Sequence, residues 1–132
     1  MKHLTSLVLG TNALHAFLKH KSLYGLAFTA LTSTSFLLHI CSKDNSYYHL
    51  TLFWLDQLAL VGVFLVGSYY TAQIPLFQQT AAVLSVVLVL IYYHYGRITQ
   101  QFCWDPQFGS QYHTFMHIAG SLGHHAILLG IA

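Results

Sequence analysis

Long uncharged stretches alternate with short polar clusters along this chain. Five apolar runs result, and they cover Leu4–Leu18, Leu23–Cys41, Tyr48–Tyr70, Leu76 to about Tyr95, and Gln111–Ala132. A helix that crosses the hydrocarbon core of a bilayer needs about 20 mainly apolar residues, whereas an open β-sheet cannot satisfy its backbone groups in lipid. The pattern therefore predicts an all-α fold, a multi-pass transmembrane helical bundle with about five spans.

The polar clusters place the ends of these helices. Residues 19–21 form a cationic turn after the first run, and residues 42–45 form a turn-type cluster after the second. Pro75 suits the first turn of the fourth helix, where its missing N–H is not needed. A longer polar stretch, residues 96–110, precedes the fifth run. No repeat or linker divides the chain, so residues 1–132 are expected to form a single transmembrane helical domain.

The first run has a competing interpretation. Lys2 followed by a short apolar stretch is also typical of a cleavable signal peptide. The run passes a poor cleavage sequence, Leu14-His15-Ala16, and continues into the cationic turn, which favours a short true span.

Composition supports the membrane assignment and excludes other classes. Only 6% of the 132 residues are charged and 55% are hydrophobic, while about a quarter of the residues of a soluble domain are charged. Five basic residues and two cysteines are too few for a nucleic-acid-binding surface or a disulfide framework. We therefore expect an integral membrane protein without a nucleic-acid partner. Its basic residues divide almost evenly between the two sides, so charge indicates neither orientation nor which membrane.

Two spans carry polar residues that are costly in lipid. Asp56 lies inside an apolar run, where an ionisable side chain faces the bundle interior or a partner; the alternative is that it lies near enough to the helix start to reach interfacial water. Ser35 and His39 are four residues apart and share a helix face. Their alternative role is ordinary hydrogen bonding between membrane helices.

The last run contains the sharper signal. His113 and His117 are four residues apart, so their imidazoles project side by side and can bind one metal ion, as the histidines of H-E-x-x-H do. No glutamate lies between them, which excludes the zincin mechanism. The alternative interpretation is two unrelated polar side chains on a buried face.

Helix order brings these positions together. In an alternating bundle His39 ends the second span, Asp56 begins the third, and His113 and His117 begin the fifth, so all of them lie in one leaflet. Three imidazoles with one open position form the ligand set of a catalytic zinc site, and the carboxylate supplies a base. His49 is seven residues before Asp56 and can share its face, whereas His124 and His125 are interpreted as packing or second-site residues.

This pattern resembles the CREST membrane hydrolase superfamily, which includes alkaline ceramidases, progestin and adiponectin receptors, haemolysin-III-like proteins and myomaker-like proteins. The matching motifs are Ser-x3-His at Ser35 and His39, an aspartate on the next span at Asp56, and His-x3-His at His113 and His117. The resemblance implies that the three histidines bind Zn²⁺, with the aspartate and serine beside the water that the metal activates. Family members typically have seven spans, so this chain would be a compact form.

Three functions follow as hypotheses. The first is a zinc-dependent hydrolase of a lipid amide or ester bond, in which Asp56 transfers protons and Ser35 hydrogen-bonds the water or the oxyanion. The second is a non-catalytic receptor or remodelling protein with a structural zinc site. The third is a b-type haem protein. The expected partner is a membrane lipid, as substrate or ligand, and short helices that bury little surface make a homo-oligomer plausible.

Overall fold

Helices account for almost all of the structure. The computed structural model describes residues 2–40, 46–98 and 109–132, and within these residues there are five α-helices and no strands. The helices are α1 (Lys2–Leu18), α2 (Ser22–Ile40), α3 (Ser46–Thr71), α4 (Leu76–Ile98) and α5 (Gly109–Gly130). Their bounds follow the five apolar runs, and the predicted all-α architecture is confirmed. Cys41 and residues 99–108 of the predicted polar stretch lie outside the described residues.

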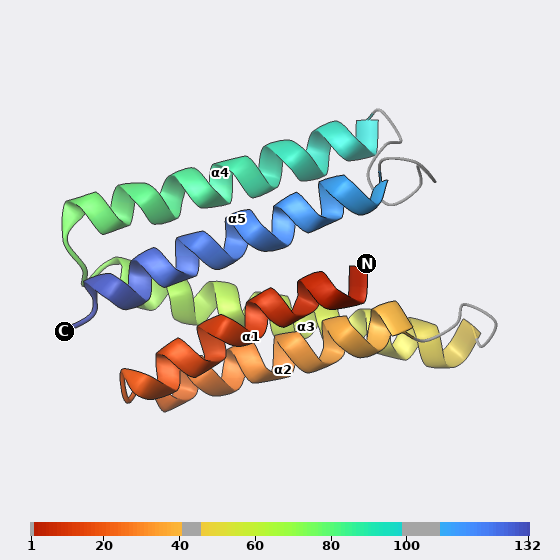
Figure 1. Ribbon diagram of the computed structural model, residues 1–132, viewed down its shortest axis with the longest axis horizontal. Helices are drawn as coiled ribbons and strands as arrows, with labels where there is room; N and C mark the ends of the chain where they lie inside the picture. The colour runs from red at the N-terminus through yellow and green to blue at the C-terminus, as the bar shows by residue number, and fades with distance from the viewer. Residues whose placement is uncertain (1, 41–45, 99–108) are drawn as a thin grey trace.

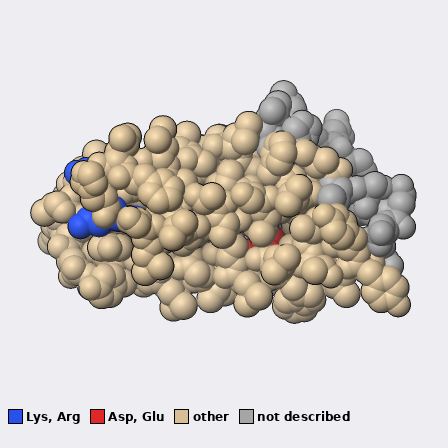
Figure 2. All heavy atoms as spheres, turned by 90° about the horizontal axis from the view of Figure 1, so that it is seen from below, with Lys and Arg blue, Asp and Glu red and all other residues tan. Residues whose placement is uncertain are grey.

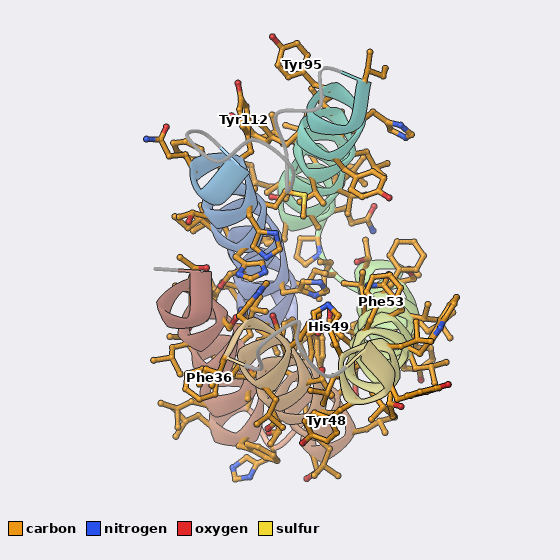
Figure 3. The ribbon with its side chains drawn as sticks, turned by 90° about the vertical axis from the view of Figure 1, so that its right-hand side faces the viewer. Phe36, Tyr48, His49, Phe53, Tyr95 and Tyr112 are labelled. Carbon is orange, nitrogen blue, oxygen red and sulfur yellow. The ribbon has the colours of Figure 1, made fainter. Side chains whose placement is uncertain are left out.

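The helices run up and down in alternation (Figure 1). Helix α1 packs against both α2 and α5, α3 packs mainly on α2, and α4 packs mainly on α5. Seen from one end, the five helices surround a common interior into which many side chains project (Figure 3). The end of α2 and the starts of α1 and α5 therefore lie at the same end of the bundle.

Two turns show why the chain reverses where the sequence predicts. His20 has φ 57°, a left-handed conformation, and the amides of His20 and Lys21 bond to the carbonyls of Phe17 and Ala16 at 2.9 Å each. These two bonds are the Schellman arrangement that ends a helix. Pro75 directly precedes α4, and its carbonyl accepts a bond from the Gln79 amide at 3.0 Å.

The bundle surface is largely apolar. Three helices of the described chain are long and apolar enough to cross a membrane, within Ser22–Ile40, Tyr47–Thr71 and Leu76–Tyr95. The other two helices are not among these three: α1 has only 17 residues, or about 25 Å, and α5 carries four histidines. In Figure 2 one face is almost wholly uncharged, with lysines gathered at one end. Leu76 and Phe77 on α4 are 76% and 81% exposed, an arrangement that lipid stabilises and water does not.

The core lies mainly between α1, α2 and α5, and Val63 of α3 and Ala82 of α4 add to it. Tyr24, Phe28 and Leu128 are fully buried there. Four polar side chains are also buried among the helices: Ser6, Asn12, Ser35 and Ser121. Three of these four belong to α1 and α5, so the interface of these two helices is polar along much of its length.

Candidate metal centre

Three histidines from two helices meet near one end of the bundle. His39 comes from the last turn of α2, and His113 and His117 come from the first turns of α5. Their ligand atoms all lie within 4.8 Å of one another, a group that can hold a metal ion. Nε2 of His39 and Nε2 of His113 are 2.9 Å apart. The ring centroids are 4.4 Å apart for His113 and His117 and 4.7 Å for His39 and His113.

Helix spacing and helix order explain this grouping. On α5 the i, i+4 pair points to one side, and that side faces α1 and α2. The last turn of α2 reaches the same level because α2 runs antiparallel to α5 (Figure 1). All three side chains are partly buried, so bound ions would be largely shielded from bulk water.

A threonine from α1 supports one of these imidazoles. Thr5 Oγ1 lies 3.1 Å from Nδ1 of His117, so Nε2 of His117 is the nitrogen available to an ion. Metal-binding histidines commonly use their second nitrogen in this way, which fixes the orientation of the ring. This role of Thr5 could not be predicted from the sequence, because a threonine in a short apolar run belongs to no motif.

Asp56 lies beside the group rather than in it. Its Oδ1 accepts a hydrogen bond from Thr34 Oγ1 at 3.1 Å, and the ligand group contains no carboxylate among the described residues. Thr34 is five residues before His39 on α2. Because Asp56 bonds to Thr34, it lies about 7.5 Å deeper along the helix axis than His39. Asp56 is the only acid in the described residues, and in Figure 2 the red acidic atoms sit in a recess between uncharged side chains.

Ser35 points toward α1. Its Oγ lies 3.0 Å from Oγ of Ser6, and both side chains are buried. This contact is a hydrogen bond between two membrane helices, which is the alternative role that the sequence suggests for Ser35. The predicted roles of Ser35 and Asp56 in catalysis remain predictions.

His49 is directed toward the bundle interior. Figure 3 shows its ring projecting between α2 and α3, while Tyr48 points away from the bundle. Nδ1 of His49 is buried and makes no hydrogen bond to the described residues. His49 is seven residues before Asp56 on α3, a separation of about two helical turns, and the shared face expected from that separation stays a prediction.

The remaining interior histidines lie deeper in the bundle than the three-histidine group. Nδ1 of His124 lies 2.5 Å from the hydroxyl of Tyr24, and its ring packs edge-on against Phe28 at 4.8 Å. His125 lies against α1, and its Nδ1 is 2.8 Å from Nδ1 of His15 on that helix. The pairing of His15 with His125 was not predicted, because no motif links the two positions.

Comparisons with known proteins return no relationship. No protein-family description, no curated protein and no solved structure matches this chain. Membership of the CREST superfamily therefore stays a resemblance carried by five residues.

The donor set indicates which ions suit the group. Three neutral imidazole nitrogens, with no carboxylate or thiolate among them, are borderline ligands that suit zinc and other late first-row metals rather than magnesium or calcium. Zinc–imidazole bonds of about 2.0–2.1 Å put neighbouring nitrogens about 3.3 Å apart in a tetrahedral site. The observed 2.9 Å between His39 and His113 needs only a small opening to reach that value.

Proposed function

We propose that this protein is a zinc-dependent intramembrane hydrolase that cleaves an amide or ester bond of a membrane lipid. The observation that carries the proposal is the meeting of His39, His113 and His117 in one partly buried group. Three histidines leave a fourth coordination position open, which is the feature that separates catalytic from structural zinc sites. The apolar surface of α2, α3 and α4 supports a substrate that reaches the group from the bilayer.

Each nearby side chain has a task in this proposal. Zinc, when bound, would activate a water molecule near neutral pH and polarise the scissile carbonyl. Asp56, about 7.5 Å deeper along the helix axis than His39, would accept the proton of that water through intervening water molecules and return it to the leaving group. Thr34 holds the carboxylate in place through its 3.1 Å hydrogen bond. Ser35 stabilises the oxyanion after turning from Ser6 toward the histidines.

A second candidate is a structural zinc site in a membrane receptor or remodelling protein. The observation in its favour is that both predicted catalytic side chains already have other partners, Asp56 with Thr34 and Ser35 with Ser6. A haem site fits less well. Haem iron needs about 4 Å between two axial nitrogens with a flat macrocycle between them, whereas Nε2 of His39 lies 2.9 Å from Nε2 of His113.

Lipid hydrolysis by matched variants distinguishes the two zinc candidates. Purified protein would be incubated with ceramide and with phospholipid in mixed micelles, and released fatty acid would be measured beside bound zinc. We expect Asp56→Asn to bind zinc normally and to lose at least 100-fold in activity, since general acid–base groups contribute about 10²–10⁴-fold. Thr80→Val is the control, because Thr80 is exposed and, among the described residues, bonds the Leu76 carbonyl of its own helix.

Two outcomes would decide against the hydrolase. Fatty-acid release that is equal in Asp56→Asn and wild type would exclude Asp56 from the reaction. Zinc bound through the three histidines with no release from either lipid would favour the structural site.

A further inference from the structure

A second pair of imidazoles lies on the same helix as the candidate metal centre. His125 is eight residues after His117 on α5, or about 12 Å deeper along the axis. Its Nδ1 lies 2.8 Å from Nδ1 of His15 on α1, and the two rings are stacked with centroids 5.1 Å apart. This nitrogen–nitrogen distance is close to the 2.9 Å between His39 and His113.

A threonine fixes the tautomer of His125. Thr11 Oγ1 donates its single hydrogen to the Val8 carbonyl at 2.6 Å, and the same oxygen is 2.9 Å from Nε2 of His125. Because that hydrogen is already used, Thr11 accepts from Nε2–H of the histidine. In the neutral ring Nδ1 of His125 then carries a lone pair that faces His15.

The same arrangement occurs at the candidate metal centre. Helix α1 supplies Thr5 to the outer nitrogen of His117 and Thr11 to the outer nitrogen of His125. Such support from a second residue orients an imidazole and raises its basicity as a metal ligand. The 2.8 Å distance alone is also that of an N–H···N hydrogen bond; the threonine support that this pair shares with the candidate metal centre is what favours a metal ligand.

We propose that His15 and His125 form a second metal-binding site, for Zn²⁺ or a similar late transition-metal ion held by the two Nδ1 atoms. Binding moves the proton of His15 from Nδ1 to Nε2, so the neutral pair releases no net proton. The two nitrogens separate by about 0.5 Å to reach the spacing of a tetrahedral zinc site. Water or an anion fills the remaining positions.

The second site is weaker than the three-histidine site. It has two protein ligands instead of three, and Lys19 follows His15 by four residues, with its amide bonded to the His15 carbonyl at 3.0 Å. The Lys19 ammonium donates to the Ile131 carbonyl at 3.3 Å, and its positive charge opposes a dication nearby. Zinc should therefore bind in two steps, first at His39, His113 and His117 and then at this pair.

Zinc titration of metal-free protein in detergent tests the proposal. Calorimetry and elemental analysis should give two zinc ions per chain for wild type. We expect His15→Ala and His125→Ala each to lose the weaker ion and keep the tighter one. His113→Ala should lose the tighter ion and keep the weaker, and His94→Ala, at an exposed position on α4, should keep both.

A variant that keeps both imidazoles controls for misfolding of the two alanine variants. Thr11→Val removes the acceptor for Nε2–H of His125 together with the local bond to the Val8 carbonyl, and it should weaken the second site by about 10–100-fold with the first site unchanged. A single zinc per wild-type chain would overturn the proposal. So would a second zinc that Thr11→Val, His15→Ala and His125→Ala all leave unaltered, because the pair would then serve only to join α1 to α5.

Discussion

Nε2 of His39 and Nε2 of His113 lie 2.9 Å apart although 74 residues separate them in the chain. The contact joins the end of α2 to the start of α5. Two neutral imidazoles in such contact can share one hydrogen bond, but His117 adds a third nitrogen within 4.8 Å. A cluster of three facing acceptor-capable rings is better satisfied by a cation than by the rings alone.

Removing the support of His117 should weaken metal binding without removing a ligand. Thr5→Val deletes the hydroxyl that lies 3.1 Å from Nδ1 of His117. Loss of such a partner typically costs 10–100-fold in metal affinity, and we expect a rise of that size in the zinc dissociation constant. Competition with a chromophoric chelator measures it. Thr80→Val should leave the constant unchanged, and an equal change in both variants would contradict the account.

Acid should release the metal. Protons and metal ions compete for the same imidazole lone pairs, so zinc affinity is highest when the three histidines are neutral and falls as pH decreases. We expect the dissociation constant to rise more than tenfold per pH unit at acidic pH, because more than one imidazole must be deprotonated for each ion bound. A dissociation constant that rises no more than tenfold per pH unit, as for the loss of one proton, would indicate that a single histidine holds the metal.

Gly67 on α3 should resist substitution because it faces a packed pair of side chains. A Cβ there would lie 2.8 Å from Cε1 of His124 and 3.3 Å from the hydroxyl of Tyr24. Overpacking of this kind costs about 1–3 kcal/mol, so Gly67→Ala should lower the unfolding temperature in detergent. Gly62→Ala, on the same helix with nothing within 4 Å, should be neutral or stabilising through helix propensity. Equal stability of the two variants would contradict the packing of α3 against α5.

His20 should be replaceable with a gain in stability. Its φ of 57° is a left-handed conformation that costs most side chains about 1–2 kcal/mol and costs glycine little. We expect His20→Gly to raise the free energy of unfolding by up to about 1 kcal/mol. His94→Gly, in the interior of α4, should lower it by about the same amount. Loss of stability in His20→Gly would show that the histidine has an interaction of its own at this turn.

The fold could be predicted because its boundaries are local. Pro75 and residues 19–21 end or begin helices through short-range backbone chemistry, and the apolar runs between them have the length of helices that lipid stabilises. The grouping of His39, His113 and His117 was also predictable. It needs only the four-residue spacing on one helix and the antiparallel order of the others.

The contacts of α1 could not be predicted from the sequence. Which helices lie beside α1 depends on how five apolar helices pack, and their apolar residues cover all sides almost evenly. Ser6 therefore takes Ser35 as its partner, and His15 takes His125, without a sequence signal for either. Asn12, fully buried and bonded to Ser121 at 2.6 Å, belongs to the same unpredicted polar interface.

The central claim is that three histidines hold one metal ion at the end of α2 and α5. Elemental analysis of purified wild type beside His39→Ala, His113→Ala and His117→Ala tests it most directly, with zinc supplied during growth and helix content checked by circular dichroism. Under conditions that fill only the tightest site, the account predicts about one zinc per wild-type chain and its loss in each folded variant. Absence of zinc from wild type, or zinc retained by all three variants, would contradict it.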